Sequence, residues 1–410
     1  MRCPKWLPFI CTIFILLAMK LCIDWSSDDL LPQSELHRSK SEWKLSAMNK
    51  LSFMGTERDF LEDDRYRTLL LNLSQELRNK IPVVDAYWNR KQHEMFQRLE
   101  SGANISMSCS ANRDVTKEIR NFDSYPDLYK QFLLYSNCHQ FPLVINQPKK
   151  CAGNQIFLLL AIKSMPQNFI NRQVVRETWG KETAYGNLWV RRVFLLGMEK
   201  GDFDPNLQHL LLFEGQRFQD ILQWDFHDSF FNLTLKDNLF LKWTTKYCPD
   251  AHFIFKGDDD IFANTMAIVN YLHSLTYPVA KALYMGHIVS NAVPFRERKS
   301  KYYIPESYYS GPYPAYAGGG GFIFTGHLAK WLYLVSYYIV FYPIDDVYIG
   351  LCFNALGIEP LAHAKFQTFD IAAKNRDNAC SHKTLLLVHQ RSPQQTLRLW
   401  KLLHDPTLSC

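Results

Sequence analysis

Short apolar runs alternate with amphipathic stretches along most of the chain, and this alternation predicts its secondary structure. Uninterrupted apolar runs are typical of buried strands. They occur at "IFLLLAIKS" (156–164), "WVRRVFLLG" (189–197), "HLLLFEG" (209–215), "AHFIFKGDDD" (251–260) and "ALYMGHIV" (282–289). Helical spacing of apolar residues marks "PQNFINRQVVRETWG" (166–180) and "NLTLKDNLFLKWTTKYC" (232–248). Strands and helices in alternation predict an α/β fold with a mostly parallel sheet that is covered on both faces.

The amino-terminal end differs from the rest of the chain. Arg2 and Lys5 precede an uncharged apolar run over residues 6–19, "WLPFICTIFILLAM". Continuing to residue 25 gives a segment of about 20 residues, the length that a bilayer core requires. A cleaved signal peptide is the alternative, but no small-x-small cleavage site follows, which favours an uncleaved signal anchor. Positive charge on the short flank keeps that end in the cytosol, so we expect a type II membrane protein.

These features divide the chain into four expected parts. Residues 1–5 form a cytosolic tail, residues 6–25 the anchor, residues 26–84 a polar stem, and residues 85–410 a lumenal body that is dense in aromatic residues. The 410 residues have 47% apolar content, which is sufficient for a large core. The formal charge of +6 is spread along the chain rather than gathered in basic arms, so a nucleic-acid partner is not expected.

N-glycosylation sequons and the cysteine pattern agree with a location in a lumenal, oxidising compartment. N-glycosylation is predicted at Asn72, Asn104 and Asn232. Seven of the ten cysteines lie beyond the anchor without metal-site spacing, which favours disulfides. We predict bonds between successive cysteines, leaving Cys410 free, although the sequence does not fix the connectivity. The expected pairs are Cys109–Cys138, Cys151–Cys248 and Cys352–Cys380.

Three consecutive aspartates, Asp258, Asp259 and Asp260, follow the predicted strand in "AHFIFKGDDD". Ligands of open α/β sheets gather at the carboxyl ends of strands. In an extended segment Asp258 and Asp260 point to one side and Asp259 to the other. Two carboxylates on one side can hold a hard divalent cation that also binds phosphate oxygens. A solvated acidic turn is the alternative interpretation.

Six motifs in order give these residues a family context. They are "RETWG" (176–180), "RVFLLG" (192–197), "DSFFNLTLK" (228–236), "FKGDDDIF" (255–262), "YAGGGGFIFTGHLA" (316–329) and "PIDDVYIG" (343–350). Over residues 85–410 the chain resembles the β-1,3-glycosyltransferases (glycosyltransferase family 31), which implies a GT-A-type nucleotide-sugar-binding fold. "AYWNR" (86–90), "FLLYSNCHQFPLVINQPKKC" (132–151), "KYYIPESYYSGPYPAYAGGGG" (301–321) and "LLLVHQRSP" (385–393) resemble its N-acetyllactosaminide β-1,3-N-acetylglucosaminyltransferase branch. Ile261 and Ala263 depart from the usual residues after the aspartates.

The resemblance implies a reaction and a metal. GlcNAc would pass from UDP-GlcNAc to the 3-hydroxyl of a terminal galactose in N-acetyllactosamine, with inversion, extending poly-N-acetyllactosamine. It implies Mn²⁺ as the cofactor, with Asp260 and His389 as metal ligands. Asp258 would lie by the ribose and the metal's waters, and Asp259 would face the sugar. A lone histidine beside a strand is otherwise most often structural.

Further donor residues are expected around the first strand and the glycine run. Four glycines between aromatic residues favour a backbone that approaches a ligand closely, although a flexible loop is the alternative. Surface cations are the alternative for the basic residues. The donor candidates are Gly319, Gly320, Lys163, Arg172, Arg176 and Asp220.

The inverting displacement also requires a base on the face opposite the departing UDP. By resemblance we assign Asp346 as this base and Asp345 as an acceptor-orienting neighbour. A helix amino-terminal cap is the alternative role for this pair. Tyr303 and Tyr316, in a tyrosine-rich segment, are predicted to contact the acceptor's apolar sugar faces, and an aromatic core is the alternative.

Two other functions are compatible with the motifs. A β-1,3-galactosyltransferase would use UDP-galactose instead, because the shared motifs fix the linkage better than the sugar. A catalytically silent glycan-binding protein would be expected to have lost the DxD or the later acid, and this chain keeps both. We expect a Golgi membrane location, a galactose-terminated glycan as acceptor, and a possible homo-oligomer or hetero-oligomer with related transferases.

Overall fold

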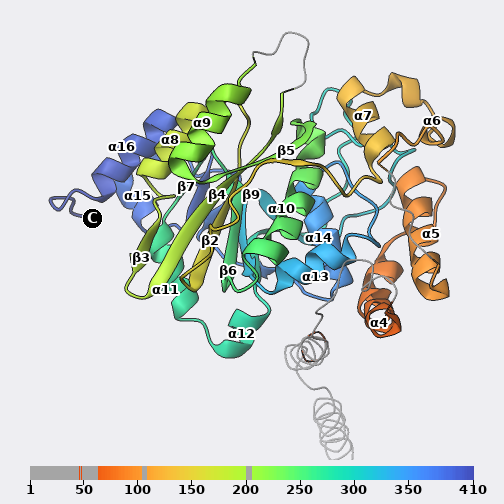
Figure 1. Ribbon diagram of the computed structural model, residues 1–410, viewed down its shortest axis with the longest axis horizontal. Helices are drawn as coiled ribbons and strands as arrows, with labels where there is room; N and C mark the ends of the chain where they lie inside the picture. Colours follow the sequence, from red (N-terminus) through yellow and green to blue (C-terminus); the bar gives the residue numbers. More distant parts are fainter. Residues whose placement is uncertain (1–45, 47, 49–62, 104–108, 200–205) are drawn as a thin grey trace, which may run out of the picture. The chain divides into compact units, whose positions relative to one another are not determined.

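The computed structural model describes residues 63–103, 109–199 and 206–410, together with positions 46 and 48 (Figure 1). Within these ranges, no helix has both the length and the apolar character needed to cross a bilayer. The predicted tail and anchor, and the stem up to residue 62 apart from those two positions, lie outside the described residues. Their assignment stays a prediction.

A mixed central sheet organises the fold. Its strand order is β1-β5-β4-β2-β6-β9-β8-β10, and β3 pairs with the amino end of β4. A separate three-stranded sheet has the order β11-β12-β7. The strands are β1 (Leu143–Ile145), β2 (Ile156–Lys163), β3 (Thr183–Tyr185), β4 (Leu188–Met198), β5 (Ile221–His227), β6 (Phe253–Asp258), β7 (Ile261–Ala263), β8 (Tyr284–Val289), β9 (Tyr316–Thr325), β10 (Leu361–Ala362), β11 (Phe366–Gln367) and β12 (Leu387–His389).

The sheet combines parallel and antiparallel pairs, and its edge strand β10 is parallel to β8. Strands β5, β4, β2 and β6 run parallel, whereas β9 is antiparallel to both β6 and β8, and β1 is antiparallel to β5. The α/β class is therefore confirmed, but the sheet is mixed because the glycine-rich strand returns between β6 and β8. The run "HLLLFEG" is not a strand. It belongs to α9 (Gln208–Phe218), whose buried residues Leu211, Glu214 and Gly215 have helical spacing.

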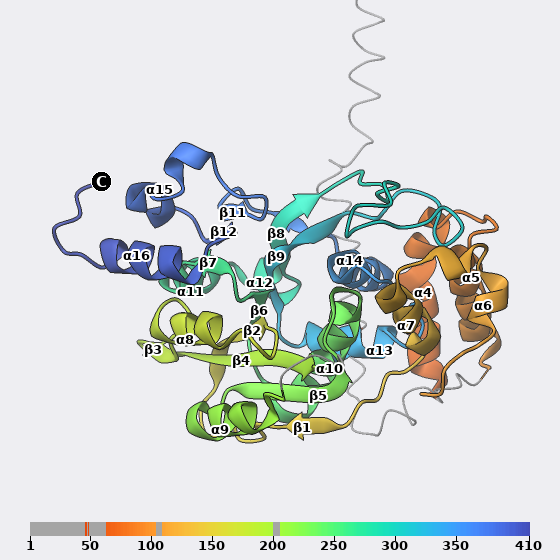
Figure 2. The same ribbon diagram turned by 90° about the horizontal axis from the view of Figure 1, so that it is seen from above.

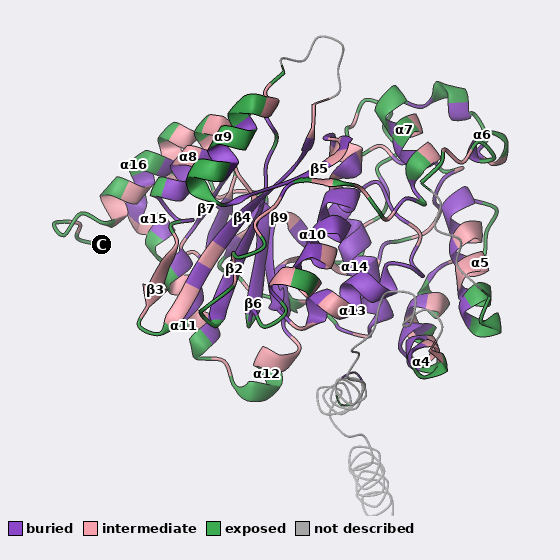
Figure 3. Ribbon diagram, viewed as in Figure 1, coloured by how far each residue is buried: buried purple, intermediate pink, exposed green. Residues whose placement is uncertain are grey.

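Helices cover both faces of the central sheet (Figures 1 and 2). Leu158, Leu160 and Ile162 of β2 alternate onto one face, where they share a core with Val175 of α8 and Ile268 of α11. Helices α10, α13 and α14 pack together elsewhere in the fold, and all three contact strands of the sheet. Figure 3 shows the central strands buried and the outer sides of α8, α9 and α16 exposed. These helices are α8 (Phe169–Glu177), α10 (Leu233–Tyr247), α11 (Thr265–His273), α13 (Leu328–Val335), α14 (Asp345–Ala355) and α16 (Pro393–Leu403).

The folded body begins before the boundary that the sequence analysis placed at residue 85. Helix α4 (Asp64–Lys80) buries four leucines and packs against α14, within a unit that spans residues 53–410. Residues 64–80 therefore belong to the body, because their apolar face has a partner. Helix α5 (Tyr87–Ser101) contacts the segment that precedes α14, because the Trp88 indole donates a hydrogen bond to the Val340 carbonyl (3.1 Å). The remaining short helices are α6 (Val115–Glu118), α7 (Asp127–Tyr135), α12 (Tyr277–Lys281) and α15 (Ala379–Lys383), with 3₁₀ turns at Phe122–Ser124, Phe230–Asn232 (η2) and Ala373–Asn375.

Two of the three predicted disulfides form, and the third is wrong. Cys109 bonds Cys138 and Cys151 bonds Cys248, as expected. Cys380 instead bonds Cys410 at the carboxyl-terminal end, and Cys352 is a free thiol. The reason is burial: Cys352 lies inside α14 with 1% of its surface exposed, whereas Cys380 is in reach of the returning carboxyl terminus.

The predicted glycosylation sites differ in access. Asn72 is exposed on α4. Asn232 is buried, and its amide donates to the His227 carbonyl (2.8 Å), so this amide is not presented to solvent, and glycosylation there stays a prediction. Asn104 lies outside the described residues.

The Cys380–Cys410 bond is open to a direct test. Non-reducing peptide mapping of the full chain should recover a Cys380–Cys410 peptide, and Cys352 should react with a thiol reagent only after unfolding. Cys410→Ser should lower the free energy of unfolding by up to about 3 kcal/mol, because the bond closes a loop across a sequence separation of 30. Recovery of a Cys352–Cys380 peptide would contradict this arrangement.

Candidate functional site

The site forms where the parallel strands β2 and β6 end side by side. Their register pairs Lys163, the last residue of β2, with Asp258, the last residue of β6. The chain then turns through Asp259 and Asp260 into the short strand β7. The carboxylates therefore stand at the carboxyl edge of the sheet, as the sequence predicts.

A second sheet brings a histidine to these carboxylates. Strand β12 runs antiparallel to β7 and places His389 opposite Ile261, one residue after Asp260. Ligand atoms of Asp258, Asp260 and His389 all lie within 4.8 Å of one another. His389 donates from Nδ1 to the Thr368 carbonyl (3.0 Å), which leaves Nε2 to face the Asp260 carboxylate at 3.4 Å. A histidine oriented through its other nitrogen is typical of metal ligands, and this donor set suits Mn²⁺.

Burial and the Asp260–His389 contact have opposite effects on the charges of this group. Burial raises the pKa of Asp258 to about 6, although Lys163 opposes the shift. Burial also disfavours charge on Asp260 and His389, but the hydrogen bond and the attraction between the two side chains outweigh this effect. The net result is a lowered pKa for the Asp260 carboxyl and a raised pKa for His389. A bound cation would stabilise the ionised carboxylates further.

Asp259 points away from the other two aspartates, as strand geometry predicts. Its carboxylate accepts hydrogen bonds from Ser164 (2.6 Å), Asn168 (3.0 Å) and Asn171 (3.2 Å). These residues follow β2 and begin α8. Asp259 therefore ties the aspartate turn to α8, and its predicted contact with the donor sugar stays a prediction.

Lys163 joins the two halves of the site. Its ammonium contacts the Asp258 carboxylate at 3.1 Å and the Asp345 carboxylate at 2.6 Å, and it lies 3.5 Å from the Gly319 carbonyl. Burial works against its charge, but Asp258 and Asp345 hold the pKa of Lys163 well above its usual value. Asp345 is 7% exposed and bound to Lys163, so it can orient its surroundings but presents little surface to an acceptor.

Asp346, the predicted base, begins α14 beside Asp345. One oxygen accepts from the Gly319 backbone N–H (3.1 Å) and the other from the Val347 N–H (2.8 Å). Burial and the neighbouring charge of Asp345 raise the pKa of Asp346 to about 7. A carboxylate with a pKa near neutrality is suited to general base catalysis.

The glycine run in β9 allows these groups to approach the strand. A Cβ on Gly319 would meet Asp346 Oδ2 at 3.4 Å, whereas a Cβ on Gly320 would meet His389 Cβ at 3.1 Å. Successive residues of a strand point to opposite faces. The glycines therefore place the predicted base and the histidine on opposite sides of one strand. Close approach of protein groups accounts for them, and donor contact by Gly319 and Gly320 stays a prediction.

Arg172, Arg176 and Asp220 differ from the prediction of donor-facing side chains. Arg172 pairs with Glu214 (2.7 Å) and donates to two carbonyls of the loop after β2. Arg176 forms a two-pronged pair with Asp220, which also accepts from Arg192 (2.9 Å). Arg172 and Asp220 have no exposed surface. Their charges are used within the protein, where they fix α8 and α9 against the sheet.

The two predicted acceptor tyrosines lie in different surroundings. Tyr316 begins β9 and packs against Gly350 of α14, which has no Cβ. Burial raises the pKa of the Tyr316 hydroxyl, and the charge of Asp346 raises it further. The backbone of Tyr303 pairs instead with Phe295 in the loop before β9. Tyr316 is therefore the one of the two placed next to the predicted base.

Sequence reasoning missed several residues that support the site. Asn168 and Asn171, three residues apart at the start of α8, could have been recognised as one polar face. Thr368 orients His389 through its backbone carbonyl, and no sequence signal marks such a contact. The buried pair of Lys256 from β6 and Asp237 from α10 lies behind Lys163, and only the fold brings these charges together.

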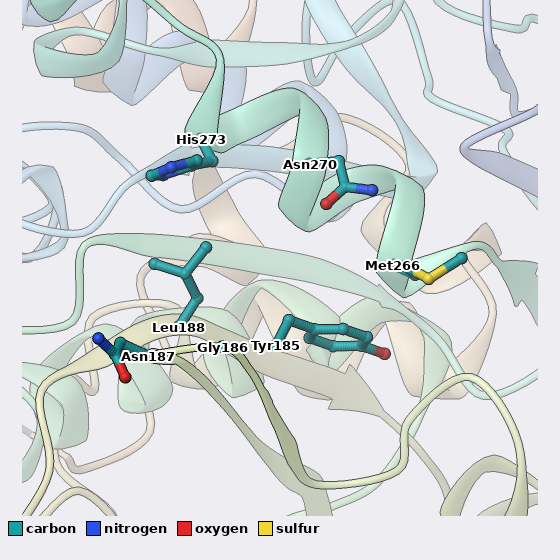
Figure 4. Close-up of a pocket in the computed structure, with 7 residues that line it drawn as sticks. All are labelled: Tyr185, Gly186, Asn187, Leu188, Met266, Asn270 and His273. Atoms are coloured by element: carbon teal, nitrogen blue, oxygen red, sulfur yellow. The ribbon is translucent and has the colours of Figure 1, made fainter.

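A surface hollow lies elsewhere in the molecule. It sits between the β3–β4 hairpin and α11, at the amino end of the strands, and shares no residue with the carboxylate site (Figure 4). Its lining residues are Tyr185, Gly186, Asn187, Leu188, Met266, Asn270 and His273. The chemistry-bearing groups are gathered at the opposite edge of the sheet.

Comparison with known proteins identifies the family of the chain. The Galactosyltransferase family model matches residues 170–363, which include the three aspartates and both residues at the start of α14. Human (Homo sapiens) N-acetyllactosaminide β-1,3-N-acetylglucosaminyltransferase 2 is 48% identical over 343 residues, covering 80% of this chain and 86% of that protein. Human UDP-GlcNAc:betaGal β-1,3-N-acetylglucosaminyltransferase 8 is 37% identical over the whole of both chains.

A third relative, mouse (Mus musculus) UDP-GlcNAc:betaGal β-1,3-N-acetylglucosaminyltransferase 7, is 40% identical over 75% of this chain and 78% of its own length. Identity at this level over so much of the chain establishes common descent and a shared fold. The chain therefore belongs to glycosyltransferase family 31 and is a glycosyltransferase whose relatives are β-1,3-N-acetylglucosaminyltransferases.

Proposed function

We propose that this enzyme transfers GlcNAc from UDP-GlcNAc to the 3-hydroxyl of a terminal galactose in N-acetyllactosamine, with inversion at the anomeric carbon. The names of its relatives support the donor and the linkage. Repeated transfer, alternating with galactosylation, would extend poly-N-acetyllactosamine. The strand-end carboxylates support a GT-A-type mode of nucleotide-sugar binding.

One observation carries the mechanism: Lys163 contacts both Asp258 of the carboxylate cluster and Asp345, the neighbour of the predicted base, so the two groups of acids meet at one edge of the sheet. Inversion requires the attacking hydroxyl and the departing UDP to lie on opposite faces of the sugar. Asp346, held by the N–H groups of Gly319 and Val347, presents a carboxylate that can take the proton of the galactose 3-hydroxyl as the bond forms. Lys163 keeps Asp345 ionised, and this charge in turn raises the pKa of Asp346.

The metal site completes the donor side. Asp258, Asp260 and His389 would hold Mn²⁺. When bound, the ion would neutralise the charge that grows on the diphosphate leaving group. The residues themselves contribute a preset geometry, since Thr368 fixes the histidine ring and Lys163 fixes Asp258.

The address of the enzyme is also part of the proposal. The amino-terminal apolar segment supports a single-pass type II anchor in the Golgi membrane, with the catalytic body in the lumen. Disulfides in the body agree with an oxidising compartment.

Donor, linkage and metal can be tested in one assay. The detergent-solubilised full chain, given N-acetyllactosamine and Mn²⁺, should transfer from UDP-GlcNAc and form a β-1,3 linkage, while UDP-galactose should be a poor donor. His389→Ala should weaken Mn²⁺-dependent UDP binding by about 10-fold or more in calorimetry, because it removes a metal ligand.

His404→Ala, at an exposed histidine near the carboxyl terminus, is the matched control and should bind as the wild type does. Transfer at the normal rate in excess EDTA would overturn the metal assignment. Efficient transfer from UDP-galactose would favour the β-1,3-galactosyltransferase alternative instead.

The base assignment makes a separate prediction. Asp346→Asn should reduce kcat by about 10²-fold or more while UDP binding stays nearly unchanged, because a base is lost but no donor contact. In the wild type, kcat/KM should fall as the pH drops through about 7, since Asp346 must be deprotonated to act. Asp346→Asn should remove this limb of the profile. The assignment would be contradicted if Asp346→Asn turned over normally. It would also be contradicted if Asp345→Asn removed the acidic limb of the pH profile while Asp346→Asn retained it.

A further inference from the structure

The loop between β8 and β9 leaves the sheet beside the predicted base. Its two ends are paired, Val289 with Tyr316. Tyr316 packs against Gly350 of α14, one helical turn after Asp346. The loop spans residues 290–315 and extends beyond β8 and β9 on the side of α14 (Figure 2). A glycan whose terminal galactose reaches Asp346 would have its remaining sugars close to this loop.

Large aromatic side chains are exposed on this loop. Phe295 is 61% exposed and Tyr302 is 39% exposed. The two rings contact each other at 6.1 Å between centroids, and Tyr302 also contacts Phe230 of η2 at 5.4 Å. Exposed aromatic residues that gather into one patch mark a binding surface more often than isolated ones do.

The patch is held in place by the backbone of the loop. The Ile304 N–H donates to the Phe295 carbonyl (2.9 Å). The Arg296 guanidinium donates to the carbonyls of Ile304 (2.7 Å) and Tyr309 (2.9 Å). A surface fixed before binding loses less conformational entropy when a ligand arrives.

A cation completes the patch. The Lys301 ammonium lies 4.9 Å from the Tyr302 ring centroid and 5.5 Å from that of Phe230. Apolar ring faces with a hydrogen-bond donor beside them match a pyranose, which has an apolar face and a rim of hydroxyl and acetamido oxygens. Three of the four patch residues lie on the loop that leads into Tyr316 at the start of β9, which favours a sugar of the acceptor over a separate ligand.

We propose that Phe295, Tyr302, Phe230 and Lys301 form an extended acceptor subsite for the sugars behind the terminal galactose. The inference rests on the proposed function, and it names the preferred substrate class as neutral lactosamine chains longer than one disaccharide. The subsite increases the affinity for the chain and takes no part in the bond that forms.

Kinetics on two acceptors test the subsite. The wild-type full chain should use a three-unit lactosamine hexasaccharide with a higher kcat/KM than the N-acetyllactosamine disaccharide. Phe295→Ala should lower kcat/KM for the hexasaccharide by about 3- to 10-fold, the range for one aromatic contact. It should leave the disaccharide value within about twofold. Phe213→Ala, at an equally exposed phenylalanine on α9, is the control and should change neither.

The alternative outcomes are distinct. If Phe295→Ala lowered kcat/KM equally on both acceptors, or left both values unchanged, the subsite would be overturned while the proposed transfer stands. If the wild type transfers no GlcNAc to either acceptor, the proposed function fails, and NMR titration with the hexasaccharide and disaccharide then decides the subsite by binding alone. A preference for 6-sulfated chains that Lys301→Met abolishes would overturn the assignment to neutral chains.

Discussion

A buried lysine between two carboxylates is the interaction on which the site depends. Lys163 ends β2, Asp258 ends β6 and Asp345 begins α14, so one ammonium connects the predicted donor side to the predicted acceptor side. Removing such a charge from water costs several kcal/mol, which close partners must offset. Because both partners contact Lys163 directly, loss of the lysine would leave two carboxylates without their cation in the interior.

The glycine-rich strand β9 separates two side chains of the site, Asp346 on one face and His389 on the other. A Cβ on Gly319 would touch Asp346 at 3.4 Å, and a Cβ on Gly320 would crowd His389 at 3.1 Å, from opposite faces of the strand. Asp346 and His389, the predicted base and the predicted metal ligand, thus flank one short piece of backbone from opposite faces. Lys163 and His389 both lie outside the segment that the family model matches, although the site includes them. The complete site therefore requires nearly the whole body.

Local sequence predicts much of this structure, because periodicity reports burial. The strands ending at Lys163 and Asp258 follow directly from their apolar runs, and the aspartates stand at the sheet edge as expected. The glycine-rich β9 does not follow, since residues without side chains carry no periodic signal. Nor does the pairing of Lys163 with Asp345, which are 182 residues apart. The Cys380–Cys410 disulfide likewise depends on the path of the carboxyl-terminal segment in the fold, which the spacing of cysteines in the sequence does not determine.

Thermal unfolding of the full chain tests the central role of Lys163 most directly. Lys163→Met keeps the length of the side chain but removes its charge, and should lower the free energy of unfolding by about 3–5 kcal/mol. Adding Asp345→Asn removes one of the two stranded charges, so the double variant should recover part of that loss and the two effects should be non-additive. Lys401→Met, at an exposed lysine, should unfold like the wild type. If Lys163→Met unfolds at the wild-type temperature, or if the double variant shows simply additive losses, the lysine does not join the two halves of the site.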